Sequence, residues 1–198
     1  EAYGKLRDLL EDSHEPLPQL VIAGNSSIDD PDGMRIFNLT MELLQSEPYM
    51  YFADDVKVVR LPHQDQVLNT LLRKSRIALQ LSIREGFEVK VTEALMKGKP
   101  VVAYRVGGIP LQIQDGVDGY LVKVGDTTQV ALDLYELLTS PELYHRMSEA
   151  ARLHAGQEYT TVPDAICWLY LATALAQGQA IDGHYQWVKA LTQKELAA

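Results

Sequence analysis

The chain has 198 residues, of which 46% are hydrophobic and 23% charged. This composition excludes a disordered or collagen-like chain, and the length is enough for one large domain with its own core. With 18 Lys and Arg against 27 Asp and Glu, the formal net charge is −9. Because tight nucleic-acid binding needs clustered cations, a nucleic-acid partner is not expected. One cysteine, Cys167, and five scattered histidines give no disulfide and no metal-binding motif.

The apolar run at 165–176 is shorter than the roughly 20 residues that a helix needs to cross a bilayer, so we expect no membrane partner and a cytoplasmic location. The sequence opens with Glu-Ala-Tyr rather than Met, and its first residues predict a helix before any strand. We therefore expect a piece of a longer protein.

Strands and helices alternate after this first helix. In chain order the pattern predicts a strand at 19–24, a loop at 25–33, a helix at 34–45, a strand at 56–61, a helix at 65–75, a strand at 76–81, a loop at 82–87, a helix at 88–96, strands at 101–104 and 119–122, and a helix capped by Asp126 that runs to 138. Strands followed by helices at this spacing indicate βαβ units and a parallel sheet, with ligands bound at the carboxyl ends of the strands.

Only helices are predicted from residue 141 onward, at 141–157, 163–177 and 183–196. The sequence thus predicts a Rossmann-like lobe at 1–158, incomplete at its N-terminus, and a helical extension at 159–198. The aromatic residues of that extension, Trp168 and Tyr170, lie in an apolar helix and are expected to pack in a core.

The segment from Ser82 to Leu95 follows a predicted strand and opens a helix. A helix N-terminus at this edge presents unpaired N–H groups and partial positive charge, which suit a phosphate. Glu85 lies in the loop, where it can accept hydrogen bonds from hydroxyls, and Glu93 lies just over a turn into the helix, so both can face one pocket. The alternative is an ordinary turn and helix cap, since acidic residues near a helix start are favourable without any ligand.

An ordered set of motifs carries a family resemblance. Glu85-Gly86-Phe87 with Glu93, Gly98-Lys99-Pro100-Val101-Val102, Gly107-Gly108-Ile109-Pro110, Asp115-Gly116 and Gly119-Tyr120-Leu121-Val122 resemble the C-terminal lobe of a retaining glycosyltransferase of the GT-B fold. Ser82-Ile-Arg-Glu-Gly-Phe, Gly-Gly-Ile-Pro-Leu-Gln-Ile-Gln-Asp-Gly and the Asp29–Gly33 loop resemble its branch of trehalose synthases and fungal retaining trehalose phosphorylases.

The resemblance implies a role for each matching residue. Glu85 matches the catalytic glutamate at the donor glucose hydroxyls, and Glu93 matches the glutamate that bonds the ribose in nucleotide-sugar enzymes. The other donor contacts fall on the backbone between them, with the sugar at Gly86 and Phe87 and the phosphate at the N–H groups of Glu88 and Val89. The family usually has Gly at position 88; a carboxylate there would repel a diphosphate unless it turns away or meets a cation such as Lys90. This difference favours phosphorolysis over nucleotide-sugar use.

The resemblance implies the donor-binding part of an enzyme that converts trehalose and phosphate into α-glucose 1-phosphate and glucose, with no cofactor and no metal. A nucleotide-sugar-dependent trehalose synthase and a non-catalytic sugar-phosphate-binding domain are the alternatives. The family's phosphate-binding Arg and Lys and its N-terminal lobe have no match in this sequence, so the chain alone is expected to be inactive. The expected partners are a sugar and phosphate (or a nucleotide sugar) and the N-terminal lobe, with a homodimer as a further option.

Overall fold

The computed structural model describes residues 1–25, 33–61, 65–180 and 188. In chain order its elements are α1 (Ala2–Asp12), β1 (Leu20–Asn25), α2 (Gly33–Leu44), a 3₁₀ helix (Tyr49–Asp55), β2 (Val56–Leu61), α3 (Asp65–Lys74), β3 (Ala78–Gln80), α4 (Val89–Met96), β4 (Val101–Tyr104), a short 3₁₀ helix (Ile109–Leu111), β5 (Gly119–Val122), α5 (Thr127–Thr139), α6 (Pro141–Glu158) and α7 (Thr161–Ala176). The strands and helices predicted between 19 and 177 are therefore present, with ends that differ by at most two residues. The predicted loop at 25–33 and helix at 183–196 fall almost entirely outside the described residues.

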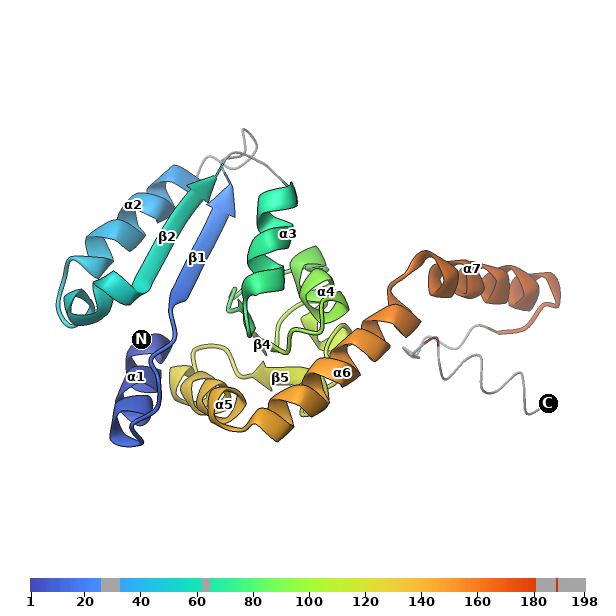
Figure 1. Ribbon diagram of the computed structural model, residues 1–198. Coiled ribbons are helices and arrows are strands. Elements are labelled where there is room, and N and C mark those ends of the chain that lie inside the picture. The colour runs from blue at the N-terminus through green and yellow to red at the C-terminus, as the bar shows by residue number, and fades with distance from the viewer. Residues whose placement is uncertain (26–32, 62–64, 181–187, 189–198) are drawn as a thin grey trace.

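The strands pair in parallel, as predicted, but they form two separate sheets (Figure 1). β1 pairs with β2, with Leu20 opposite Val56, while β3, β4 and β5 form the second sheet in that order. No hydrogen-bonded pairing joins β1 to β3 within the described strands.

Helices cover both faces of the three-stranded sheet. Along β4, Val102 and Tyr104 belong to a core cluster with apolar residues of α1 and α5. Val101 and Ala103 point to the opposite cluster, with residues of α4 and α6. All four residues of β4 are buried, which explains why this strand reads as a continuous apolar run. The β4 backbone is thus a fixed platform for the loops at its carboxyl end.

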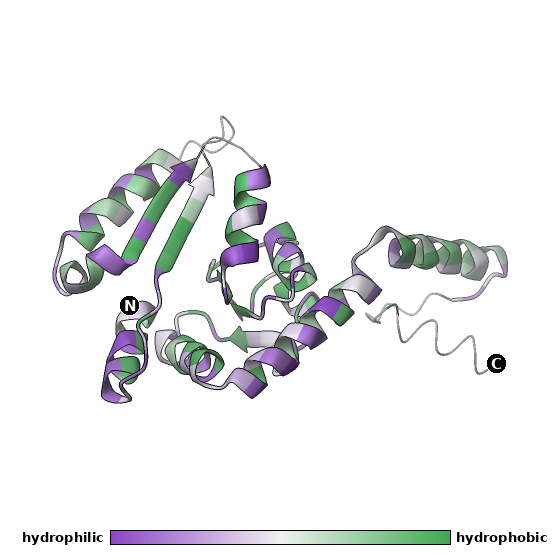
Figure 2. Ribbon diagram, in the orientation of Figure 1, coloured by the Kyte–Doolittle hydropathy of each residue, from purple (hydrophilic) through white to green (hydrophobic). Residues whose placement is uncertain are grey.

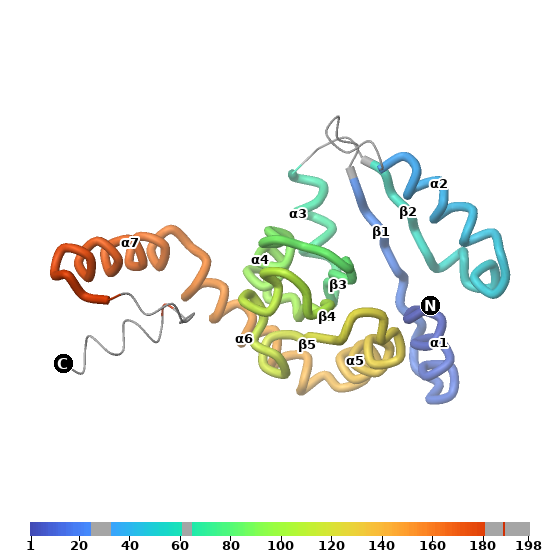
Figure 3. The backbone as a smooth tube through the Cα atoms, turned by 180° about the vertical axis from the view of Figure 1, so that it is seen from behind, coloured from blue at the N-terminus to red at the C-terminus, as the bar shows by residue number. Residues whose placement is uncertain are grey.

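The first sheet and the last helix are much less buried. α2 contributes no buried residue, and Val21 and Ile22 of β1 are each 41% exposed. α7 is hydrophobic along its length, yet it projects from the body beyond the end of α6 in both views (Figures 2 and 3). Trp168 is 67% exposed, so the prediction that it packs in a core is wrong for this chain. Among the described residues, no helix combines the length and apolar character needed to cross a membrane.

Candidate functional site

The loop between β3 and α4 carries the residues singled out in the sequence. It leaves the carboxyl end of β3 and enters α4 through Glu88, the N-cap residue, whose backbone is extended. Phe87 and Val89 are 58% and 57% exposed. Large apolar side chains exposed beside a helix N-terminus are available to a ligand or to another part of a protein.

Glu85 is oriented by the last residue of β3. The Gln80 side-chain amide donates to Glu85 Oε1 at 3.0 Å and to the Ser82 hydroxyl oxygen at 2.9 Å. Gln80 thereby ties the start and the middle of the loop to the strand. Because a neutral amide holds only one of its oxygens, the Glu85 carboxylate keeps further acceptor capacity for hydroxyl groups.

The turn after β4 lies directly against the Glu85–Gly86 backbone. The Gly108 N–H donates to the Gly86 carbonyl oxygen at 2.9 Å. Gly107 has a φ of +54°, and a Cβ atom at this position would stand 1.7 Å from the Glu85 carbonyl oxygen. No side chain fits there, so the Gly107-Gly108 pair is required to bring the two loops together at one edge of the sheet.

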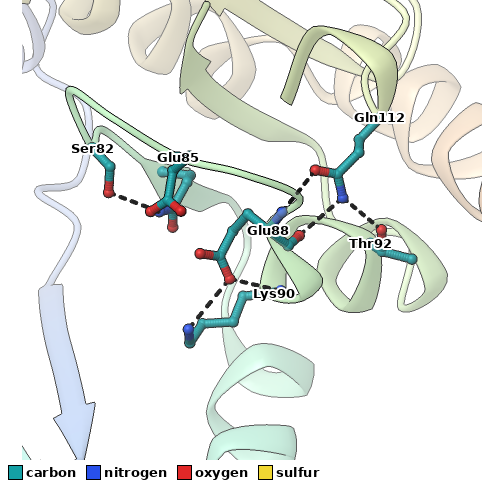
Figure 4. Close-up of polar contacts among 7 residues, drawn as sticks. Ser82, Glu85, Glu88, Lys90, Thr92 and Gln112 are labelled. Atoms are coloured by element: carbon teal, nitrogen blue, oxygen red, sulfur yellow. Dashed lines mark hydrogen bonds and ion pairs between the residues drawn. The ribbon is translucent and has the colours of Figure 1, made fainter. Parts of the chain in front are cut away.

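The negative charge of the Glu88 carboxylate is compensated by Lys90. One carboxylate oxygen, Oε1, accepts the Lys90 N–H at 3.1 Å, which caps α4, and lies 3.3 Å from Lys90 Nζ. The carboxylate is therefore turned onto its own helix and paired with the cation that sequence reasoning named (Figure 4). This is the arrangement in which a carboxylate at the helix start is compatible with a nearby anion.

Sequence reasoning missed Gln112, which is fully buried beneath the loop. Its Oε1 accepts the Glu88 N–H at 3.1 Å, and its Nε2 donates to the Glu88 carbonyl oxygen at 2.9 Å and to the Thr92 hydroxyl oxygen at 2.8 Å (Figure 4). The Glu88 N–H that the resemblance assigns to a phosphate is thus donated to Gln112. The only signal in the sequence was a polar residue between Leu111 and Ile113 in the Gly-Gly-Ile-Pro motif.

A cavity of about 580 Å³ opens on the other side of the α4 N-terminus. Phe87 and Glu93 lie in its wall, which the junction of α6 and α7 completes from Glu158 to Thr161. The ring of Tyr159 meets Phe87 edge to face at a centroid distance of 6.1 Å, and its hydroxyl donates to the Leu111 carbonyl oxygen at 2.5 Å. The start of the predicted helical extension is therefore part of this wall.

The structure thus gathers the predicted residues around the start of α4 but divides them between two surroundings. Glu85 is held by Gln80 at the sheet edge, whereas Phe87, Val89 and Glu93 line the cavity, whose wall does not include Glu85. In the part of the chain that the structure describes, no cluster of three His, Cys, Asp or Glu side chains is able to hold a metal ion.

Known proteins share this sequence and fold. Residues 5–154 match the family model described as glycosyl transferases group 1. The chain is 48% identical to a trehalose phosphorylase from Pleurotus pulmonarius over 200 residues, which cover 98% of the chain and 27% of the relative. It is 37% identical to a trehalose synthase from Pyrococcus horikoshii over 154 residues, covering 77% of the chain and 34% of that relative. The chain therefore spans only about a quarter to a third of the length of these relatives.

Solved structures confirm the expected fold class, an α/β lobe with parallel strands followed by helices. The C-terminal domain of a glycosyl transferase group 1 family protein from Francisella tularensis superposes with a TM-score of 0.61 at 18% identity, covering 81% of this chain and 79% of that one. The fold is that of the C-terminal lobe of a GT-B glycosyltransferase.

Proposed function

Because the chain belongs to the group 1 glycosyl transferases, we propose that it is the donor-binding part of a retaining trehalose phosphorylase. The observation that carries the proposal is the 48% identity to a trehalose phosphorylase along 98% of the chain. The pairing of Glu88 with Lys90 is compatible with a phosphate bound nearby, since it leaves an anion site with one carboxylate already neutralised.

In the proposed reaction, the glycosidic bond of trehalose breaks at the anomeric carbon, and the leaving glucose takes a proton from the attacking hydrogen phosphate. A phosphate oxygen forms the new bond from the same face, which gives α-glucose 1-phosphate with retained configuration. Glu85 holds donor hydroxyls and the Gly86 and Phe87 backbone contacts the sugar. The start of α4 faces the phosphate with the Val89 N–H, since the Glu88 N–H is donated to Gln112. No acid and nucleophile pair of the hydrolase type is needed, so Glu85 and Glu93 are given binding roles.

β1 and β3 are edge strands of the two separate sheets, which supports the proposal that a further strand completes the lobe. A parallel strand inserted between β1 and β3 would give the order β2, β1, inserted strand, β3, β4, β5, which is the doubly wound order with ligands at its switch point. We assign that strand, the cations facing the phosphate and the acceptor site to the rest of the enzyme. The 198 residues alone are then expected to be inactive.

The exposed apolar surface of α7 supports a contact with another part of the protein. Four of its large side chains are 64–68% exposed: Val162, Trp168, Leu169 and Leu175. We assign this surface, with the extension at 159–198, to the N-terminal lobe of the same enzyme. A second copy is the other candidate, and the mass of the complete enzyme in solution separates the two.

We also place the enzyme in the cytoplasm, which fractionation of the source cells tests.

Glu85→Ala in the complete enzyme tests the proposal. Loss of a preorganised contact to the reacting sugar should lower kcat by about 100-fold or more while the melting temperature stays unchanged. Glu42→Ala, which removes an exposed carboxylate on α2, is the matched control and should leave turnover unchanged. Near-normal turnover of Glu85→Ala would contradict the assignment.

The nucleotide-sugar alternative is favoured by the 37% identity to a trehalose synthase. Calorimetry on the complete enzyme with α-glucose 1-phosphate and with UDP-glucose separates the two. Phosphorolysis predicts binding of the first, and the synthase predicts binding of the second. Binding of neither, without turnover, would support the non-catalytic domain.

A further inference from the structure

Four basic side chains from three elements line a hollow of about 350 Å³ at the far end of α4. Arg73 comes from the last turn of α3, Lys97 and Lys99 from the turn after α4, and Arg152 from α6. α4 contacts both α3 and α6, which brings these segments together (Figures 1 and 3). In a chain with a net charge of −9, this concentration of positive charge is local rather than general.

The hollow lies away from the Glu85 loop, although Met96 is in the wall of both the hollow and the 580 Å³ cavity. Lys99 and Pro100 immediately precede β4, so the hollow lies at the amino edge of the sheet, whereas Glu85 and Glu88 lie at the carboxyl edge. The eight residues of α4 separate the two along the helix axis by about 12 Å. An anion in the hollow would not contact the Glu85 loop.

The turn at Gly98 holds two of the cations together. Gly98 has a φ of +64°, and the Ser148 hydroxyl donates to its carbonyl oxygen at 2.6 Å. A Cβ atom on Gly98 would stand 3.0 Å from Arg152 Nη2, so the guanidinium of α6 lies against this turn and next to Lys99. The glycine is what lets the guanidinium approach so closely.

None of the four cations pairs with a carboxylate within the described ranges of the chain. Lys97 Nζ donates to a neutral group, the Glu93 carbonyl oxygen, at 3.2 Å. The positive charge of the hollow is therefore available to an anion.

Favourable interaction with helix C-termini accounts for only part of this cluster. Arg73 and Lys97 stand where cations stabilise the ends of α3 and α4 without any ligand. Arg152 is six residues from the end of α6, and Lys99 lies beyond α4. Burial and the charge of Arg152 lower the pKa of Lys99, so these two cations oppose each other in the free protein. A bound anion would relieve that repulsion.

We propose that this hollow binds an anion of the phosphate class, such as inorganic phosphate, pyrophosphate or a phosphate monoester, at a site distinct from the donor site. Guanidinium groups bind phosphate oxygens in pairs, and two of them beside two ammonium groups match a multiply charged anion better than a single carboxylate. The volume suits a small ligand.

Calorimetric titration of the complete enzyme with pyrophosphate, and separately with inorganic phosphate, at fixed ionic strength tests the proposal. Lys99→Gln with Arg152→Gln should remove one binding event or weaken it at least tenfold. Arg35→Gln with Lys123→Gln, which makes the same charge change at exposed positions elsewhere, should bind as the unmodified enzyme does. Comparing the two anions shows whether one or two phosphate groups are needed.

Lys99→Arg with Arg152→Lys keeps the charge and should retain the site, which guards against a folding defect in the Gln variant. Equal binding by the Gln variant and the unmodified enzyme would overturn the proposal, and so would equal losses in the Gln variant and its charge-matched control. The readout is binding, so the test stands whether or not the enzyme proves to be a trehalose phosphorylase.

Discussion

At the scale of single residues, Gln112 sets the backbone at the start of α4. A buried amide is tolerated where its hydrogen bonds are made, and here both ends of the amide bond Glu88 while Nε2 also bonds Thr92. These bonds fix the N–H and C=O of the cap residue at the same time. The direction of the α4 N-terminus therefore depends on one side chain from the turn after β4.

We expect Gln112→Leu to lower kcat/KM of the complete enzyme about 10- to 100-fold. The apolar side chain fills a similar volume but leaves the part-buried Glu88 N–H without a partner, a loss that costs about 1–3 kcal/mol, while the Glu88 carbonyl oxygen keeps its bond from the Val91 N–H. Gln112→Glu keeps the acceptor and loses the donor, so its kcat/KM should be intermediate.

Gln114→Leu is the matched control for this variant. It removes a half-buried amide two residues away and should change kcat/KM little. Steady-state kinetics with trehalose and phosphate measure all three variants. An unchanged kcat/KM in Gln112→Leu would show that the Glu88 backbone keeps its position without the Gln112 amide.

At the scale of elements, two loops from neighbouring strands interlock. The turn after β4 reaches the loop after β3 through Gly108 and Gly86, and Gly107 leaves room for the Glu85 carbonyl group. The helix that begins beside them is capped by its own Glu88. The position of Glu85 therefore depends on the turn after β4 as well as on its own loop after β3.

Gly107→Ala should abolish most turnover of the complete enzyme, because the added Cβ would stand 1.7 Å from the Glu85 carbonyl oxygen and must displace the loop. Gly125→Ala provides the control. Gly125 also has a positive φ, +82°, but open space surrounds the added Cβ, so only backbone strain of about 1–2 kcal/mol is expected there. If both variants lost the same small amount of activity and stability, the contact between the two loops would not be needed to position Glu85.

The elements themselves could be predicted from the sequence because each depends on local patterns. Apolar runs marked β4 and β5, and Asp126 marked a helix start as its cap. Gln112 could not be found, since its partners are 20 and 24 residues away and only the fold brings them near. The apolar sequence of α7 also does not tell whether the Trp168 side chain packs in the core of this chain or lies exposed for contact with another part of the protein.

At the scale of the whole molecule, the expected single sheet is divided. Local patterns do not specify which strands are neighbours, so the sequence predicted parallel strands without the separation between β1 and β3. The β3–β4–β5 sheet is covered on both faces and holds most of the core. The sheet of β1 and β2 contributes a single buried side chain among the described residues, Val56.

This uneven burial has a consequence for cooperativity. Local opening is easiest where few apolar contacts must be broken, so backbone amides of β1 and β2 should exchange with deuterium well before those of β4. Exchange followed by mass spectrometry on the 198-residue chain should give two classes of protection, and a single uniform class would contradict this. Heating should then melt the chain in two steps, with the β1–α2–β2 unit separating first from a more durable remainder.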